Sequence, residues 1–235
     1  GQTLGIGGES GSGKSNVARC VARLIDSDSG EILLDGTDIA NLTAQSLRPL
    51  RRRAQMVFQD PYRSLNPRWK VGDAIIEGPL NFGVPRAEAL ERARSLMETV
   101  KLDVKALDRY PHQFSGGQRQ RICIARALAM EPELLIADEA VSALDVSVQA
   151  QVLALLNDVR QKLHLAMMFI THDLRVAAQV CDHVAVMSKG EVVEYGTVRE
   201  VFGAPSHAYT RALFAAAPGK GFAFGKAPAA ELRHG

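Results

Sequence analysis

Two glycine-rich segments of this sequence carry the residue types that bind phosphate groups. The first is Gly8-Glu9-Ser10-Gly11-Ser12-Gly13-Lys14-Ser15, in which two glycines separated by four residues are followed by lysine and serine. In such a P-loop the glycines let backbone N–H groups turn inward around the phosphates, the lysine adds a point charge, and the serine hydroxyl helps to hold Mg²⁺. Asn16 opens the helix that follows, and a helix N-terminus attracts anions. We therefore expect residues 8–16 to bind the phosphates of a nucleotide.

The second segment, Ser115-Gly116-Gly117-Gln118, is a glycine-rich helix start that resembles another phosphate site. A phosphate bound at the first loop needs no other helix. A purely structural interpretation is also open, because Ser115 at the N-cap and Gln118 three residues later form a capping box. The sequence therefore indicates either a helix cap or a second binding segment in a chain that already has one.

The elements that must position these segments follow from the hydrophobic pattern. Apolar runs predict strands at 3–6, 54–58, 134–137, 166–170 and 183–187, and longer periodic stretches predict helices at 16–25, 86–100, 118–130 and 147–164. Alternation of strand and helix is typical of an α/β fold with a mostly parallel sheet. Ligands of such sheets bind at the carboxyl ends of the strands, and the run 134–137 delivers Asp138-Glu139 to that edge. The fold expected is a P-loop NTPase core of the α/β class.

The predicted core is interrupted by two additions. A short strand closed by an Asp-Gly turn at 30–36 predicts a small antiparallel β lobe. Prolines and glycines then break up the chain before helical patterns return, which predicts a helical insertion subdomain at 61–130. The chain is thus a single domain, with core and β lobe at 1–60 and 131–217. The stretch 218–235 is rich in Gly, Ala and Pro and is expected to be a flexible tail.

Six motifs in chain order resemble those of the ATP-binding cassette (ABC) ATPases. They are the P-loop, Gln59 after a strand, Ser115 to Gln118, Asp138-Glu139, Ser142-Ala143-Leu144-Asp145 and His172. The resemblance covers nearly the whole chain, and six motifs in order are very specific. It implies the ABC ATPase fold and the hydrolysis of ATP with Mg²⁺. It also implies that Ser115 to Gly117 of one subunit closes over ATP held by the P-loop of another, so that two chains enclose two nucleotides.

The resemblance also implies a chemical role for each residue around the phosphates. Asp138 is expected to hold Mg²⁺ together with Ser15 and Gln59, although an acidic residue there could simply cap the next helix. Glu139 is expected to polarise the attacking water as a general base. Gln59 opens the helical insertion, which suits a coupling element. A glutamine after a strand is otherwise an ordinary polar loop residue.

Two further residues gain their interpretation from the resemblance alone. His172 is implied to contact the γ-phosphate, whereas a histidine after a buried strand is more often structural. Asp145 is implied to meet the partner subunit near its P-loop, whereas by itself it is a helix N-cap. The residues expected to contact ATP, from either subunit, are Gly8, Glu9, Ser10, Gly11, Ser12, Gly13, Lys14, Ser15, Asn16, Ser115, Gly116, Gly117, Gln118 and Asp145. The residues expected to be catalytic are Glu139, His172 and Gln59.

The sequence departs from the family pattern at two places that matter here. Gly7 stands where an apolar residue is usual, which predicts a looser strand just before the P-loop. Relatives carry an aromatic residue upstream of the P-loop that stacks on adenine, and we assign no residue of this sequence to that role.

Composition excludes several classes of protein. The 235 residues are 46% apolar and 23% charged, which is ordinary for a soluble globular domain. A net charge of +2 gives no strong general attraction to nucleic acid, and no nucleic-acid partner is expected. The 3 cysteines show no metal-binding spacing and are typical of a reducing compartment. No run of about 18 apolar residues is present, so a partner must supply any membrane-spanning helices.

Two segments narrow the resemblance to one group of transporters. Residues 59–67 and 205–213 are similar to the ATPase subunits of bacterial oligopeptide, dipeptide and nickel importers, although the second, read alone, could be a Pro-started surface helix. The resemblance implies a peripheral ATPase at the cytoplasmic face of the membrane. The resemblance also implies that this ATPase pairs with an identical or similar ATPase and drives a permease docked on the insertion from Gln59 to Ser115. An extracytoplasmic solute-binding protein is expected to contribute indirectly. A cassette acting on DNA or ribosomes, or a module that binds ATP without turnover, are the alternatives.

Overall fold

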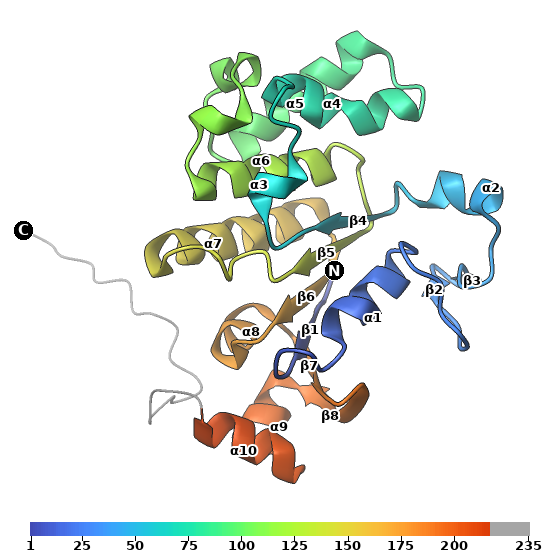
Figure 1. Ribbon diagram of the computed structural model, residues 1–235, viewed down its shortest axis with the longest axis vertical. Helices are drawn as coiled ribbons and strands as arrows, with labels where there is room; N and C mark the ends of the chain where they lie inside the picture. Colours follow the sequence, from blue (N-terminus) through green and yellow to red (C-terminus); the bar gives the residue numbers. More distant parts are fainter. Residues whose placement is uncertain (217–235) are drawn as a thin grey trace, which may run out of the picture.

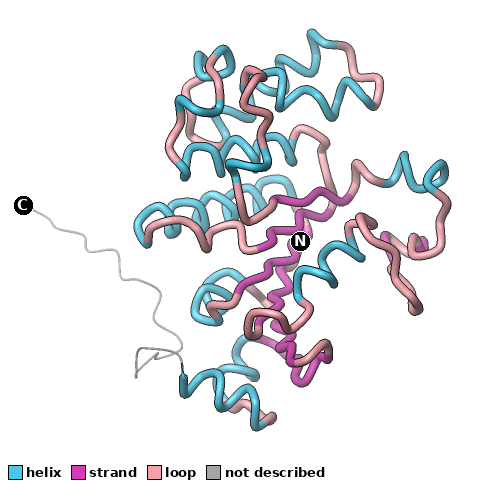
Figure 2. Tube along the Cα trace, in the orientation of Figure 1, coloured by secondary structure: helices cyan, strands magenta, loops and turns pink. Residues whose placement is uncertain are grey.

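A six-stranded sheet forms the centre of the molecule, with strand order β4-β5-β6-β1-β7-β8. The structure, a computed structural model, describes residues 1–216, so the predicted tail at 218–235 lies outside the described residues. The strands are β1 (Thr3–Gly7), β4 (Ala54–Val57), β5 (Leu134–Asp138), β6 (Ala166–Thr171), β7 (His183–Ser188) and β8 (Glu191–Thr197). All neighbours pair in parallel except β7 and β8, which form an antiparallel hairpin. Figure 2 shows these strands as one continuous magenta stack.

Helices cover both faces of this sheet, as the alternation of elements predicts. Figure 1 shows α1 on one side and α7 and α8 on the other. Successive residues of β5 lie on opposite faces of the sheet. Leu135 and Ala137 belong to the largest buried cluster, and Ile136 packs with Ile6 and Ala18 in a smaller cluster. This alternation follows from the period of two in a strand. The helices of the core are α1 (Lys14–Val21), α7 (Val146–Leu163), α8 (Leu174–Val180), α9 (Val198–Gly203) and α10 (Ala208–Ala216).

Between β4 and β5 the chain forms a group of helices, drawn above the sheet in Figure 1. They are α3 (Pro61–Ser64), α4 (Val71–Asn81), α5 (Arg86–Thr99), η2 (Val104–Asp108), η3 (Pro111–Gln113) and α6 (Gly116–Leu128). Buried side chains of α4, α5, η2 and α6 share one cluster with those of α7 and with Leu135 and Ala137 of β5. The helical content matches the expected insertion, while the division into separate subdomains stays a prediction.

The small β lobe and the segment leading to β4 complete the described chain. An antiparallel pair, β2 (Leu33–Leu34) and β3 (Thr37–Asp38), replaces the longer strand expected at 30–36, followed by α2 (Ala44–Leu47) and η1 (Arg48–Leu50). The pair is antiparallel as predicted. Within residues 1–216 no helix is long and apolar enough to cross a membrane.

One local expectation is wrong, and one alternative interpretation does not match the structure. Gly7 is paired in the sheet with Thr171 on one side and Val186 on the other, so the strand before the P-loop is not loose. A Cβ at Gly7 would overlap the terminal methyl group Cδ2 of Leu174 in α8, so the leucine side chain would have to move. The helix of the late motif begins at Ala208, three residues after Pro205, so proline does not start it.

Candidate active site

Four loops that carry the predicted site residues leave the sheet at one edge. They follow β4, β5, β6 and β1, which are neighbours in the sheet. Because these strands are parallel, their carboxyl ends lie at the same edge. Gln59 follows β4, Asp138 ends β5, His172 follows β6, and the P-loop follows β1. The fold therefore brings together side chains that are far apart in the sequence.

The P-loop needs glycine at two positions for different reasons. Gly8 has φ +148°, and a Cβ there would overlap the carbonyl oxygen of Met187 at the end of β7. Gly13 has φ +98° and is the N-cap of α1, a left-handed position that glycine adopts at little cost. These conformations turn the chain sharply from β1 into α1. The first-turn N–H groups of α1 are consequently available to an anion.

Lys14 lies inside the loop, with 4% of its surface exposed. Its ammonium nitrogen donates hydrogen bonds to the carbonyl oxygens of Gly8 at 2.9 Å and Glu9 at 2.7 Å. Burial lowers the pKa of Lys14, and the charges of Glu139 and Asp138 partly oppose this change. The loop thus holds a cation among carbonyl groups, at the position where the sequence predicts the outer phosphates.

Ser15 and Asp138 form the link between the P-loop and β5. The Ser15 hydroxyl donates to Oδ1 of Asp138 at 2.9 Å, across 123 residues of sequence. Asp138 is 6% exposed. Burial raises the pKa of Asp138, the hydrogen bond from Ser15 opposes this, and the nearby Glu139 carboxylate adds to it. A hydroxyl and a desolvated carboxylate at hydrogen-bond distance are hard oxygen donors of the kind that Mg²⁺ prefers.

Glu139 lies at the centre of a second group of site residues, which also contains Gln59 and His172. Gln59 Nε2 donates to Oε2 of Glu139 at 3.0 Å, and Nδ1 of His172 lies 3.4 Å from Oε1. Glu139 also has φ +47°, an unusual conformation for a residue other than glycine, which costs about 1–3 kcal/mol and clusters at functional sites. Gln59 and His172, the two other residues predicted to be catalytic, therefore both contact the carboxylate of Glu139.

Ser142 belongs to this cluster and was not among the residues predicted to act there. Its hydroxyl accepts from Gln59 Nε2 at 3.3 Å and donates to the carbonyl oxygen of Glu139 at 3.0 Å. The signal was its place in the motif Ser142 to Asp145, of which only the aspartate was selected. Ser142 helps to hold the glutamine amide against the carboxylate.

The segment Ser115 to Gln118 forms the capping box that the structural interpretation predicts. Ser115 Oγ accepts from the N–H of Gln118 at 3.3 Å, and Gln118 Oε1 accepts from the N–H of Ser115 at 3.0 Å. Asp145 likewise caps α7, accepting from the N–H of Val148 at 3.0 Å. These hydrogen bonds stay within the two helix starts, so within one chain the segment forms a cap rather than a second phosphate site beside Lys14.

Comparison with known proteins gives consistent matches at the level of sequence. The profile of the family described as "ABC transporter" matches residues 1–142. A Brucella ovis protein named as a peptide import ATP-binding protein is 50% identical over 219 residues, which is 93% of this chain and 69% of that protein. The glutathione import ATP-binding protein GsiA of Escherichia coli O157:H7 is 51% identical over 219 residues, 93% of this chain and 35% of that longer protein.

A solved structure matches at the level of fold. It is a dimeric post-hydrolysis state of the ATP-binding cassette MJ0796 bound to ADP and Pi, with a TM-score of 0.73 and 28% identity, covering 84% of this chain and 86% of that one. The fold agrees with the expectation drawn from the sequence. The chain therefore belongs to the ABC transporter family, as one of its ATP-binding proteins that hydrolyse ATP.

Proposed function

We propose that this protein is the ATPase subunit of an importer that takes up peptides or a related small solute through a separate permease. The observation that carries the proposal is the convergence of Lys14, Ser15 and Asp138 with Gln59 and Glu139 at one edge of the sheet. The cargo class is supported by the names of the relatives, one for peptide import and one for glutathione, which is itself a tripeptide. Residues 59–67 and 205–213, which resemble the ATPase subunits of peptide importers, also support this cargo class.

In the proposed reaction the P-loop binds the phosphates, and the residues around Glu139 position and activate the water. The backbone N–H groups of the P-loop and the Lys14 ammonium bind the β- and γ-phosphates, where they offset the charge that develops during transfer. Glu139 orients the attacking water and accepts its proton. Gln59 and His172 hold the two oxygens of that carboxylate, at 3.0 and 3.4 Å, so that it faces the phosphate with little rotational freedom.

The same arrangement fits Mg²⁺. Ser15 Oγ and Asp138 Oδ1 are 2.9 Å apart and would hold the ion with phosphate oxygens, water and the Gln59 amide. Bound there, Mg²⁺ neutralises phosphate charge. The described residues hold no cluster of three or more His, Cys, Asp or Glu side chains suited to a metal. The proposed site is therefore completed by the nucleotide.

The proposed working form is a dimer of two such subunits, identical or similar. The MJ0796 cassette, similar in fold, is dimeric with bound ADP and Pi. In the proposed dimer Ser115 and its glycines close over the partner's nucleotide, and Asp145 contacts the partner near its P-loop. The capping box supports this use, because it fixes the helix start and leaves the faces of Gly116 open, with the nearest atom 3.7 Å from a Cβ built there.

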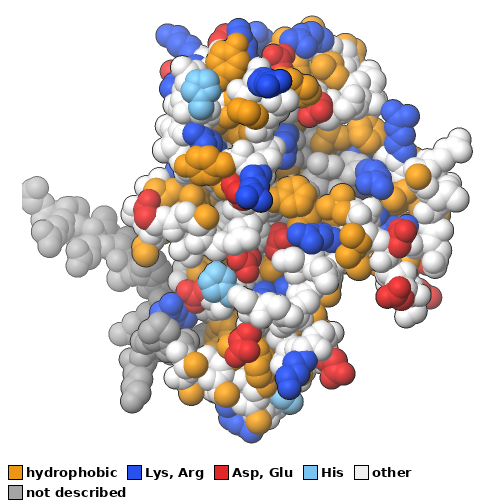
Figure 3. Space-filling model, in the orientation of Figure 1, with side chains coloured by type: hydrophobic (Ala, Val, Ile, Leu, Met, Phe, Trp, Pro, Cys, Tyr) orange, Lys and Arg blue, Asp and Glu red, His pale blue; other side chains and the backbone are white. Residues whose placement is uncertain are grey.

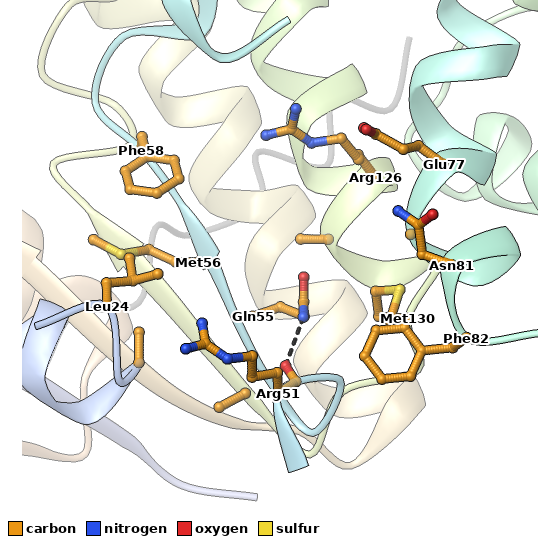
Figure 4. Close-up of a pocket in the computed structure, with 14 residues that line it drawn as sticks. Leu24, Arg51, Gln55, Met56, Phe58, Glu77, Asn81, Phe82, Arg126 and Met130 are labelled. Atoms are coloured by element: carbon orange, nitrogen blue, oxygen red, sulfur yellow. Dashed lines mark hydrogen bonds between the residues drawn. The ribbon is translucent and has the colours of Figure 1, made fainter. Parts of the chain in front are cut away.

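A cavity between the sheet and the helical insertion is the proposed docking site of the permease (Figure 4). It has a volume of ≈ 340 Å³ and lies between β4, α4 and α6, with Leu24 and Phe58 on one side and Phe82 and Met130 on another. Arg51, Arg126 and Glu77 add charge at its walls. Phe58 precedes Gln59 directly, so a cytoplasmic segment of the permease seated here would move the glutamine that contacts Glu139.

We assign the protein to the cytoplasmic face of the membrane as a peripheral subunit, with the solute-binding protein acting on the other side. On the face drawn in Figure 3, Lys and Arg side chains are interspersed with Asp and Glu side chains, which fits a protein partner better than nucleic acid. The net charge of +2 agrees with this.

Hydrolysis by the purified protein tests the proposal. Glu139→Gln is expected to keep ATP binding while lowering phosphate release by roughly 10²-fold or more, because it removes the general base. Glu191→Gln, an exposed carboxylate on β8, is the matched control and should hydrolyse ATP like the unmodified protein. Near-normal hydrolysis by Glu139→Gln would contradict the assigned role. Co-purification with ribosomes or DNA in place of a permease would contradict the transport function.

A further inference from the structure

The segment 205–213, similar to peptide importers in sequence, has no task in the mechanism above. The structure places it against the β7–β8 hairpin. Tyr209, Leu213 and Phe214 pack on the buried cluster that includes Val184 and Val201. The helix α10 is therefore a fixed part of the core.

Glu194 of β8 fixes the start of this segment. Its Oε1 accepts from the N–H and the hydroxyl of Ser206 at 2.6 and 2.9 Å, and its Oε2 accepts from the N–H of His207 at 3.2 Å. Partial burial raises the pKa of Glu194, but hydrogen bonds including those from Ser206 and His207 outweigh burial and lower it to about 2. His207 Nδ1 in turn accepts from the N–H of Tyr209 at 3.2 Å. This chain of contacts sets the position of the tyrosine.

Tyr209 reaches the P-loop. Its hydroxyl oxygen accepts from the N–H of Glu9 at 3.2 Å, across 200 residues of sequence. The carbonyl oxygen of Glu9 accepts a hydrogen bond from Lys14 Nζ at 2.7 Å. Glu9 is thus held on one side by Tyr209 and on the other by the cation that the mechanism assigns to the phosphates.

The hairpin beside α10 makes two further contacts with the loop. The N–H of Gly190, at the turn between β7 and β8, donates to the carbonyl oxygen of Ser12 at 3.1 Å. The carbonyl oxygen of Met187 lies directly against Gly8. Gly8, Glu9 and Ser12 are therefore each contacted by the C-terminal part of the described chain, and the first half of the loop rests on it.

We propose that the segment 205–213 positions the P-loop for nucleotide, and that Tyr209 is its positioning residue. The hydroxyl of Tyr209 fixes the Glu9 peptide, so the loop keeps the shape in which its later N–H groups face the phosphates. This pre-organisation raises the affinity for nucleotide without taking part in the chemical step. The inference rests on the proposed phosphate site at residues 8–15.

Nucleotide binding by the full chain tests this inference. Tyr209→Phe removes only the hydroxyl and keeps the ring in its apolar contacts. The dissociation constant of a fluorescent ATP analogue is expected to rise about two- to fivefold, the effect of losing one partly exposed hydrogen bond. KM for ATP rises with it, whereas kcat and the melting temperature stay unchanged. Glu194→Gln, which weakens the anchor of the segment, shifts the dissociation constant in the same direction.

The matched control is Tyr195→Phe, since Tyr195 lies on β8, is 64% exposed, and contacts His183 through its ring. It should bind nucleotide like the unmodified protein. Equal affinities for Tyr209→Phe and Tyr195→Phe overturn the inference. A loss of affinity accompanied by a lower melting temperature and a lower kcat also overturns it, because it assigns Tyr209 to general stability.

A separate variant tests the proposed phosphate site at residues 8–15, on which this inference rests. Lys14→Ala is expected to lose nucleotide binding if residues 8–15 bind the phosphates. If Lys14→Ala fails to bind while Tyr209→Phe binds normally, the P-loop site is correct and the positioning role is wrong. If Lys14→Ala binds nucleotide normally, the proposed site itself is wrong.

Discussion

The two glycines of the segment Ser115 to Gln118 should respond to substitution in opposite ways. A Cβ at Gly117 would come closer than 3.0 Å to Cγ1 of Val148 on α7, a separation that real Cβ contacts essentially never show. A Cβ at Gly116 would meet nothing closer than 3.7 Å, from the hydroxyl oxygen of Tyr62. Gly117 is thus required by packing within the chain, whereas Gly116 is not.

The magnitudes follow from this difference. Forcing an extra carbon into a packed contact costs about 1–3 kcal/mol, and replacing a helical glycine by alanine returns about 0.5–1 kcal/mol. From the midpoints of these ranges, Gly117→Ala should destabilise the protein by about 1 kcal/mol and lower the melting temperature by about 2–4 °C. Gly116→Ala should leave the melting temperature unchanged or slightly higher.

Thermal unfolding of four proteins measures the effect: the unmodified protein, Gly117→Ala, Val148→Ala and the double variant. Shortening Val148 removes the overlapping methyl group, so the double variant should recover about 1–2 kcal/mol relative to the sum of the single changes. Additive single effects, or an unchanged melting temperature for Gly117→Ala, would refute the packing argument. Gly116→Ala should be as stable as the unmodified protein yet hydrolyse ATP more slowly, because its Cβ lies on the face proposed to meet the partner's nucleotide.

Two other surfaces give simpler predictions. Ser115→Arg should leave nucleotide binding by the monomer nearly intact but abolish ATP-dependent dimerisation and hydrolysis. If light scattering still detects an ATP-dependent dimer of this variant, the segment Ser115 to Gln118 acts only as a helix cap. Leu24→Glu, at a leucine that lines the proposed permease site and is 48% exposed, should keep hydrolysis by the isolated subunit and lose co-purification with the permease. Leu163→Glu, at a leucine of matched exposure (49%) on α7, is its control, and loss of the permease from both variants would contradict the assignment of the cavity.

Much of the fold could be predicted because its signals are local. The strands β1, β5 and β6 are apolar runs that lead directly into motif residues, and each ends within one residue of its expected bound. The rule that parallel strands share a carboxyl edge then predicts that their loops meet. The contact between Ser15 and Asp138 is of this kind: both residues were expected to share one ion, and the 2.9 Å hydrogen bond shows that the pair is already adjacent.

The remaining features depend on contacts between distant parts of the chain. Gly7 predicts a looser strand, whereas it lies next to Leu174 of α8, and no local pattern identifies that neighbour. The hydrogen bond from Glu9 to Tyr209 joins the first loop to the last described helix. The motif around Tyr209 is visible in the sequence, but its place against the P-loop depends on contacts of residues 205–213 with β8.

The contrast between the two glycine-rich segments bears on how the protein couples binding to hydrolysis. Ser15 donates a hydrogen bond to Asp138 within one chain, and Lys14 lies in the same loop, so we expect a monomer to bind nucleotide. The hydrogen bonds of Ser115 and Gln118 stay within their own helix start. A two-fold pairing is self-complementary, so if Ser115 of one subunit faces the P-loop of the other, the reverse contact follows and two sites form together. Binding should then precede dimerisation and hydrolysis should require it, which is why Lys14→Ala and Ser115→Arg should fail at different steps.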